Sequence, residues 1–147
     1  MATTRTAEAT WSGTLFEGSG TIDLTSSGTV SGVGVSWPSR TEEANGKTSP
    51  EELIAAAHAA CYSMAFSKQL ADRGGSPDEL KVRATSSFEK TDAGFRLTKM
   101  HLEVNAVVPG IDEDAFQEAA AVAKDGCPVS NALKGNVEIT LDATLKS

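Results

Sequence analysis

The amino-acid sequence predicts an α+β fold built on antiparallel β-sheet. Three short segments of alternating apolar and polar residues fill the first third of the chain, as half-buried strands do. A long capped helix, a β-hairpin, a second helix and a final alternating segment follow in that order. Because strands and helices are not interleaved as repeated strand–helix–strand units, antiparallel pairing is favoured over a parallel sheet.

Length, composition and charge bound the class of protein. The chain has 147 residues, of which 39% are hydrophobic, so one globular domain over residues 1–147 is expected. The 20 acidic and 13 basic residues give a net charge of −7, which repels nucleic-acid phosphates and anionic lipid surfaces. No apolar run reaches the roughly 20 residues that cross a bilayer, and the N-terminus lacks the apolar block of a signal peptide. A cytoplasmic protein without nucleic-acid or membrane partners is predicted.

The first third is expected to form strands and turns, followed by a loop. Alternation places strands near residues 11–15, 21–24 and 33–37, with glycine- and serine-rich turns between them. Residues 37–48 are mostly polar and are predicted to form a loop that carries Arg40 toward the helix that follows.

The strongest helix signal begins at Ser49. Ser49 is the predicted N-cap, Pro50 occupies the first helical position, and Glu52 completes a capping box at the third. The helix is expected to run to about Arg73, after which a glycine pair ends it. Residues 53–66 are apolar on nearly every helical face, which is typical of a buried helix.

A β-hairpin comes next. Residues 80–88 and 95–108 alternate on either side of a turn at residues 92–94. Along the return strand the apolar positions change parity, which predicts a β-bulge near Thr98 or Lys99.

The last third is expected to hold a helix and a strand. Asp112 is the predicted N-cap of a helix that ends at Gly126. Pro128 disfavours the helical region for Cys127 and makes it a candidate N-cap of a short following turn. Residues 137–145 alternate as a final strand. The apolar face of the helix consists of Phe116, Ala119, Ala120 and Ala123.

The chemistry-bearing residues are few: Cys61, Cys127, His58 and His101. A closed zinc site would need all four, and no Cys-x-x-Cys pair exists, so no metal is expected. A thiol reacts as its thiolate, which helix N-termini and nearby cations favour. Cys127 at an N-cap has local amide donors, whereas Cys61 lies well inside a helix and would need a cation brought to it.

Two interpretations of the cysteines stay open on this evidence. Free cysteines are often small buried hydrophobic residues, which suits an alanine-rich helix. Against that, the two lie in different elements of a chain expected in a reducing compartment, where idle disulfides are rare. A catalytic pair fits such a compartment. One thiolate would attack an oxidant and become a sulfenic acid, and the other would condense with it to a disulfide that a dithiol reductant reopens.

Two sequence blocks carry a resemblance to a known family. They are residues 49–65 (SPEELIAAAHAACYSMA) and residues 126–130 (GCPVS). Both resemble the signature blocks of the OsmC/Ohr family, the osmotically inducible and organic hydroperoxide resistance proteins. Residues 109–112 and 139–142 resemble the OsmC branch, so the likeness spans nearly the whole chain. It implies an intertwined α+β homodimer with antiparallel β-sheets around two central helices, and a thiol-dependent peroxidase that reduces organic hydroperoxides.

The resemblance also implies roles for single residues. Cys61 would be the peroxidatic cysteine and Cys127 the resolving one. The family glutamate, ten residues before the first cysteine, corresponds to Glu51, and the OsmC-branch arginine corresponds to Arg40. The Ohr branch carries its arginine in an early strand, and this sequence has none between Arg5 and Arg40, which indicates the OsmC branch. No organic cofactor or metal is implied, and the dithiol reductant is not specified, the lipoyl type being one candidate.

Helix geometry adds a condition on this site. Ten residues of α-helix rise about 15 Å, so Glu51 cannot touch Cys61 of its own chain on a straight helix. Antiparallel packing against the two-fold mate would bring Glu51 of one subunit to Cys61 of the other, which makes the dimer necessary for the site. Glu52 serves the cap, and Glu51 is then free to orient Arg40. The Arg40 guanidinium would lower the pKa of Cys61 and hydrogen-bond the peroxide.

Other functions are less favoured by the sequence. The main alternative is a redox-sensing or binding module that uses the same cysteine pair without turnover. A Cys/His hydrolase based on His58 and Cys61 is a further one, although no third group orients the imidazole and no oxyanion hole is evident. Four large side chains are expected in the core, some of them lining an apolar pocket that favours alkyl peroxides. They are Phe16, Tyr62, Met64 and Phe66.

Overall fold

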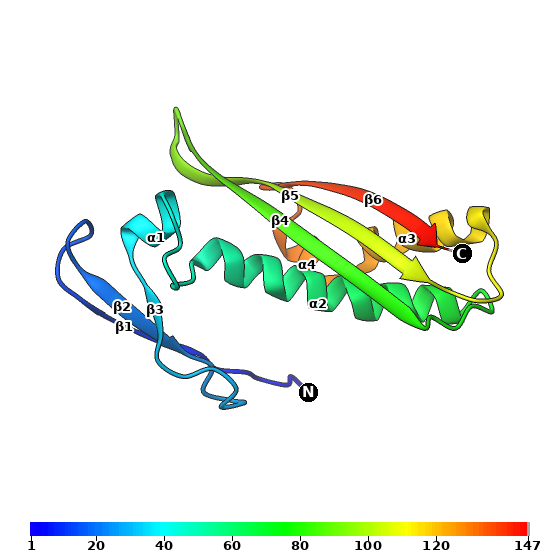
Figure 1. Ribbon diagram of the computed structural model, residues 1–147, viewed down its shortest axis with the longest axis horizontal. Helices are drawn as coiled ribbons and strands as arrows, with labels where there is room; N and C mark the ends of the chain where they lie inside the picture. The colour runs from blue at the N-terminus through cyan, green and yellow to red at the C-terminus, as the bar shows by residue number, and fades with distance from the viewer. Residues whose placement is uncertain (147) are drawn as a thin grey trace. The chain divides into compact units, whose positions relative to one another are not determined.

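The computed structural model describes residues 1–146 and divides the chain into two compact units (Figure 1). The first unit covers Met1–Leu53 and the second begins at Ile54. Helix α2 (Pro50–Ala71) starts in the first unit and continues in the second. The single domain expected over residues 1–147 stays a prediction, and residue 147 lies outside the described residues.

The first unit contains a three-stranded antiparallel sheet. Its strands are β1 (Glu8–Ser12), β2 (Ser19–Asp23) and β3 (Val33–Val35), paired in that order. β1 lies three residues earlier than expected, because the chain turns after Ser12. Gly13 has a φ of 94°, a conformation that side chains with a Cβ rarely adopt, and it therefore ends the strand.

A short helix, α1 (Trp37–Thr41), replaces the first half of the loop expected over residues 37–48. Ser36 caps it: the Ser39 N–H donates to Ser36 Oγ at 3.2 Å, and the Ser36 N–H donates to Ser39 Oγ at 3.0 Å. This reciprocal cap stabilises a helix of only five residues, with Pro38 in its first turn. Arg40 is thereby carried on a helix rather than a loop.

Helix α2 begins at the predicted cap. The Glu52 N–H donates to Ser49 Oγ at 3.1 Å, which confirms Ser49 as N-cap. The Glu52 carboxylate accepts a hydrogen bond from Thr48 Oγ1 at 2.5 Å, one residue before the cap. The helix ends at Ala71, two residues before the expected end, and Gly74 follows with a φ of 82°.

Within the second unit only one face of α2 is buried, although its sequence is apolar on nearly every face. Tyr62 and Phe66 lie in the core as predicted. Met64 is 70% exposed, because it lies on the opposite face of the helix from these two residues. Phe16 is 69% exposed in the turn after β1, so the core prediction was wrong for both Met64 and Phe16. The buried stripe of the helix consists of Ala55, His58, Tyr62, Phe66 and Leu70.

The second unit contains a sheet of β4 (Glu79–Thr91), β5 (Gly94–Val107) and β6 (Glu138–Lys146), with β5 in the middle. β4 and β5 form the predicted antiparallel hairpin. Ser87 pairs with Lys99 and the next residue, Phe88, pairs with Leu97. Thr98 is therefore the extra residue of a β-bulge, which confirms the predicted change of parity.

β6 departs from the expected antiparallel pairing because it runs parallel to β5, beginning with Glu138 beside Lys99. A parallel neighbour requires a crossover of a dozen or more residues, usually through a helix. The chain between the two strands supplies it with α3 (Glu113–Gly126) and α4 (Pro128–Leu133). The crossover returns the chain to the start of β5, so this sheet is mixed.

Helix α3 confirms its sequence signals. The Ala115 N–H donates to the N-cap Asp112 at 2.8 Å. The core of the second unit packs the buried faces of α2 and α3 against β5. No helix in residues 1–146 is long and apolar enough to cross a membrane. The predicted apolar face of α3, now fully buried, consists of Phe116, Ala119, Ala120 and Ala123.

Candidate active site

The two cysteines come from the elements predicted to hold them. Cys61 lies in the middle of α2, and Cys127 is both the residue after α3 and the N-cap of α4. Cys127 has an extended backbone, with φ −65° and ψ 125°, as the proline that follows it requires. Both thiols are free, Cys127 fully buried and Cys61 half-buried.

The structure brings the two thiols into contact within the second unit. The thiols of Cys61 and Cys127 lie close enough for each to interact with the other, and the Val129 N–H lies close to the sulfur of Cys61. The Val129 amide at the start of α4 therefore acts on Cys61, whereas the Cys127 side chain makes no cap hydrogen bond. The sequence interpretation assigned these donors to Cys127, because the packing of α4 on α2 cannot be read from the chain order.

The surroundings of Cys61 in this unit disfavour its thiolate. Burial raises the pKa of Cys61 above its usual value, and the neighbouring Cys127 raises it further. The Val129 N–H acts in the opposite direction because it hydrogen-bonds the charged form. In this unit the thiol form of Cys61 is therefore favoured over the thiolate.

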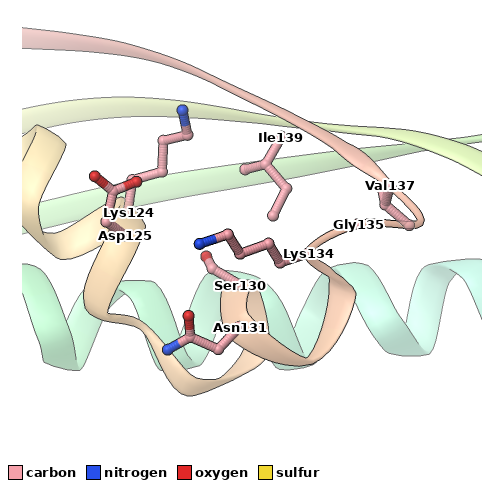
Figure 2. A pocket seen from close by; sticks show the side chains of 8 residues that line it. All are labelled: Lys124, Asp125, Ser130, Asn131, Lys134, Gly135, Val137 and Ile139. Atoms are coloured by element: carbon pink, nitrogen blue, oxygen red, sulfur yellow. The ribbon is translucent and has the colours of Figure 1, made fainter.

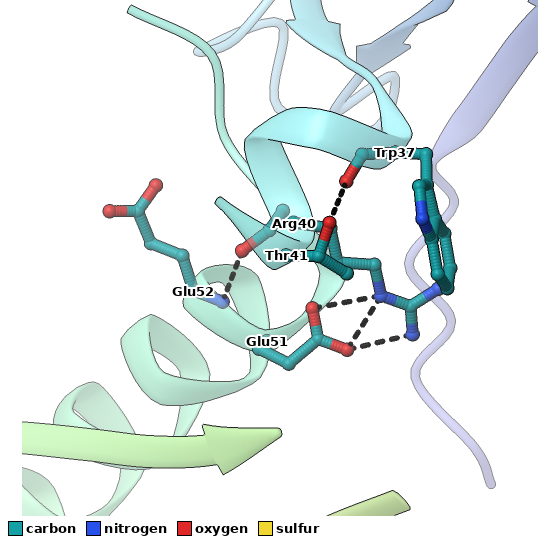
Figure 3. Close-up of polar contacts among 6 residues, drawn as sticks. Trp37, Arg40, Thr41, Glu51 and Glu52 are labelled. Carbon is teal, nitrogen blue, oxygen red and sulfur yellow. Dashed lines mark hydrogen bonds and ion pairs between the residues drawn. The ribbon is translucent and has the colours of Figure 1, made fainter. Parts of the chain in front are cut away.

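A cation with a fixed orientation is present in the first unit. Arg40 Nε donates to both carboxylate oxygens of Glu51, at 3.0 and 3.1 Å, and Nη2 donates to Oε1 at 2.7 Å (Figure 3). The guanidinium also lies 5.9 Å from the centroid of the Trp37 ring. The Arg40 side chain is 32% exposed and that of Glu51 is 11% exposed. Held on two sides, the guanidinium keeps part of its edge accessible to a ligand.

Arg40 also borders an apolar pocket of about 340 Å³ formed within the first unit. Trp11 and Leu15 line it and are 43% and 50% exposed, so their apolar surface is accessible from the pocket. None of the four large side chains named as candidate pocket residues lines it. The strand alternation that placed Trp11 and Leu15 on one face was the signal for it. The complete lining is Ala9, Trp11, Leu15, Ile22, Val35, Ser36, Trp37, Arg40, Pro50 and Leu53.

A buried polar pair accompanies the cysteines in the second unit. His58 Nε2 and Ser130 Oγ are 2.7 Å apart, and their residues are 0% and 4% exposed. Nδ1 of His58 is buried and has no hydrogen-bond partner among the described residues. Burial lowers the pKa of His58, so the imidazole is kept neutral. Sequence analysis assigned Ser130 no role of its own, although it ends the second signature block, residues 126–130, three residues after Cys127.

Ser130 also lines a second pocket of about 210 Å³, between α4, the end of α3 and the start of β6 (Figure 2). Asn131 of α4, Lys134 just after α4, and Lys124 of α3 are among its other lining residues. The fourth chemistry-bearing residue, His101, lies on β5 and bonds Thr140 of β6 at 2.6 Å. Residues 1–146 contain no group of three or more His, Cys, Asp or Glu side chains that could hold a metal ion.

The chain is similar to known proteins along its whole length. The sequence profile described as "OsmC: OsmC-like protein" matches residues 43–142. The chain is 44% identical over 147 residues to Peroxiredoxin OsmC of Escherichia coli (strain K12), covering 100% of both proteins. It is 34% identical over 95 residues to the organic hydroperoxide resistance protein of Xanthomonas axonopodis pv. citri (strain 306), covering 64% of this chain and 65% of that one.

A solved structure shares the fold. It is the crystal structure of an organic hydroperoxide resistance protein OsmC from Legionella pneumophila, with a TM-score of 0.72 at 25% identity. The superposition covers 98% of each chain. The fold of this chain is therefore shared with a solved relative.

Proposed function

The chain belongs to the OsmC-like protein family, and from that premise we propose that it reduces organic hydroperoxides with Cys61 as the first thiol and Cys127 as the second. It is a cysteine-based peroxidase of the OsmC branch. The observation that carries the proposal is the contact between the two free thiols. Two cysteines that merely filled the core would have no need to meet.

The first step consumes the peroxide. The Cys61 thiolate attacks the outer oxygen of ROOH, a sulfur–oxygen bond forms and the oxygen–oxygen bond breaks. The leaving alkoxide takes up the proton released by the thiol, so Cys61–SH and ROOH become Cys61–SOH and ROH.

The second and third steps restore the enzyme. The Cys127 sulfur attacks Cys61–SOH, a disulfide forms, and hydroxide leaves as water with the proton of Cys127. A dithiol then exchanges with this disulfide, returning both cysteines as thiols and leaving itself oxidised. A lipoyl-type dithiol is one candidate for this reductant.

Arg40 and Glu51 supply the cation that Cys61 lacks. Glu51 fixes the guanidinium by two-pronged hydrogen bonding, and the guanidinium stabilises the Cys61 thiolate and hydrogen-bonds the peroxide. Because Glu51 and Cys61 lie ten residues apart on α2, we place the pair against Cys61 of a second copy in a homodimer. The exposed apolar face of α2, which includes Met64, supports an interface between copies.

The apolar pocket beside Arg40 indicates an organic substrate. A peroxide held by Arg40 would place an alkyl or aryl group among Trp11, Leu15 and Trp37. Removing apolar surface from water contributes about 25 cal/mol per Å², a gain that hydrogen peroxide cannot make.

One experiment tests the whole scheme. Intact mass and free thiols are measured after one equivalent of cumene hydroperoxide or of hydrogen peroxide, on the wild type and on Cys61→Ser. We expect rapid loss of both thiols and of two hydrogen atoms with the organic peroxide, abolished by the substitution. Two unreactive thiols in the folded protein would refute the proposal. Oxidation that occurs once and does not recycle with excess dithiol would instead identify a redox sensor.

A further inference from the structure

The helices that carry the two cysteines are joined by two neighbouring contacts. Cys61 of α2 meets Cys127 and Val129 at the start of α4. One helical turn earlier on α2, His58 meets Ser130, three residues further along α4. The two contacts run in opposite senses along the two helices, so α2 and α4 are antiparallel here. The His58–Ser130 bond therefore fixes the register in which the thiols face each other.

Burying this polar pair has a cost in the free energy of folding. A buried imidazole and a buried hydroxyl lose their hydration, and His58 recovers one hydrogen bond while its Nδ1 has no partner in the described part of the chain. An apolar pair of the same volume would satisfy the core without this loss. A directional bond differs from apolar packing in one respect, because it holds two atoms at a fixed distance and angle.

Helix α4 needs such a restraint. It has six residues, and it borders the pocket of about 210 Å³ that Asn131 and Lys134 line (Figure 2). Because this pocket is not filled by side chains, packing alone does not fix α4 on the side that faces it. Its inner side meets α2 through Cys127, Val129 and Ser130. Among these contacts, the one made by Ser130 is a hydrogen bond to a side chain of α2 that does not involve a thiol.

We propose that His58 and Ser130 are positioning residues for the second chemical step, holding α4 so that Cys127 reaches the oxidised Cys61 before other reactions do. This inference rests on the proposed peroxidase function. In that step the sulfur–oxygen bond of Cys61–SOH breaks, the disulfide bond forms, and the proton of Cys127 leaves in water. The His58–Ser130 bond persists while the Cys61 sulfur changes from thiol to sulfenic acid, so it keeps the register when the thiol–thiol contact is lost.

The test separates the two oxidation phases by rapid mixing with cumene hydroperoxide, followed by intact mass. In Ser130→Ala we expect Cys61 to be oxidised at the wild-type rate, whereas disulfide formation is about tenfold slower, because small misplacements of reacting atoms are expensive. The longer-lived sulfenic acid should then be trapped by dimedone or, with excess peroxide, be oxidised to sulfinic acid. Ser130→Thr keeps a hydroxyl and should restore most of the rate.

A matched control and a double variant exclude a general loss of stability. Asn131→Ala changes the adjacent residue of α4, which is exposed and lines the same pocket, and should resolve normally. His58→Leu/Ser130→Ala removes both polar partners, which is less destabilising than stranding one of them. The double variant should recover thermal stability relative to Ser130→Ala and still resolve slowly. A resolution rate that recovers together with stability would reduce the pair to a structural role.

The outcomes also distinguish this inference from the function on which it rests. If the wild-type thiols do not react with the organic peroxide, the peroxidase proposal itself is wrong. If they react and Ser130→Ala forms its disulfide as fast as the wild type, the function stands and the positioning role is overturned.

Discussion

At the scale of single residues, the feature to consider is how the neighbours of Arg40 orient its guanidinium. Arg40 meets Glu51 through two nitrogens and lies beside the Trp37 ring, so its guanidinium has little freedom to rotate. Lysine carries the same charge but lacks the fork that this geometry uses. The position and shape of the guanidinium, rather than its charge alone, should therefore determine how much Arg40 accelerates the oxidation of Cys61.

Replacing Arg40 tests this directly. We expect Arg40→Lys to slow the oxidation of Cys61 by about 100-fold, the cost typical of losing one oriented donor to a developing charge. Stopped-flow measurement of the first oxidation phase provides the rate. Lys47, a neighbouring cation in the same unit, serves as control through Lys47→Ala. Equal rates for Arg40→Lys and the wild type would show that a diffuse positive charge suffices.

The pKa of Cys61 also depends on Cys127. Because Cys127 raises the pKa of Cys61, Cys127→Ala should lower the pKa of Cys61. A lower pKa means more thiolate at a given pH, so the midpoint of the alkylation rate against pH should move to lower pH. Iodoacetamide labelling followed by peptide mass checks the midpoint. An upward movement would mean that the cavity left at Cys127 exposes Cys61 to a different environment than the one described.

At the scale of secondary structure, the caps decide where the functional side chains are presented. Helix α1 has five residues and carries Arg40, and its N-terminus depends on the reciprocal Ser36–Ser39 bonds. We expect Ser36→Ala to cost about 1 kcal/mol of stability. The first oxidation phase should slow as well, because α1 then frays. Thr41→Ala, at the other end of α1, is the control, and the comparison requires denaturant unfolding and peroxide kinetics on the same preparations.

The elements that could be predicted are those whose signals are local. The Ser49 cap, the Thr98 bulge and the Asp112 cap depend on residues within a few positions, and all three were found where the sequence indicated. Helix α1 was missed because its cap uses serine at both positions instead of a glutamate. The parallel direction of β6 was missed because it depends on the path of a crossover some thirty residues long.

The same distinction between local and long-range signals applies to the candidate active site. The meeting of Arg40 with Glu51 and the importance of Cys61 and Cys127 followed from the motifs and the family resemblance. The Val129 amide and the His58–Ser130 bond could not be predicted, because they arise only when α4 packs antiparallel on α2. Interactions between elements far apart in sequence carry no local signature.

At the scale of the whole molecule, the unburied surface points to assembly. Ala56, Ala57, Ala60 and Met64 are exposed on one face of α2, and small residues allow close approach of another helix. If this face packs on a second copy, a charge placed in it should separate the subunits.

Met64→Glu is the variant to make. We expect a monomer in sedimentation or native mass measurements, and a loss of peroxidase activity because Arg40 of one subunit would no longer reach Cys61 of the other. Val122→Glu, at an exposed apolar position of α3 that is 40% exposed, controls for the added charge. A monomeric variant that turns over normally would show that one chain completes the site alone.

The contact between Cys61 and Cys127 has a thermodynamic consequence as well as a chemical one. The two positions are 66 residues apart, so a disulfide between them would close a loop that contains most of the second unit. By chain-entropy arguments such a closure restricts the unfolded state by about 4 kcal/mol at most. The oxidised protein should therefore melt at a higher temperature than the reduced one. On the proposed mechanism the reduced protein is the less stable form. Each catalytic cycle would then stabilise the fold when the disulfide forms and remove that stabilisation when the disulfide is reduced.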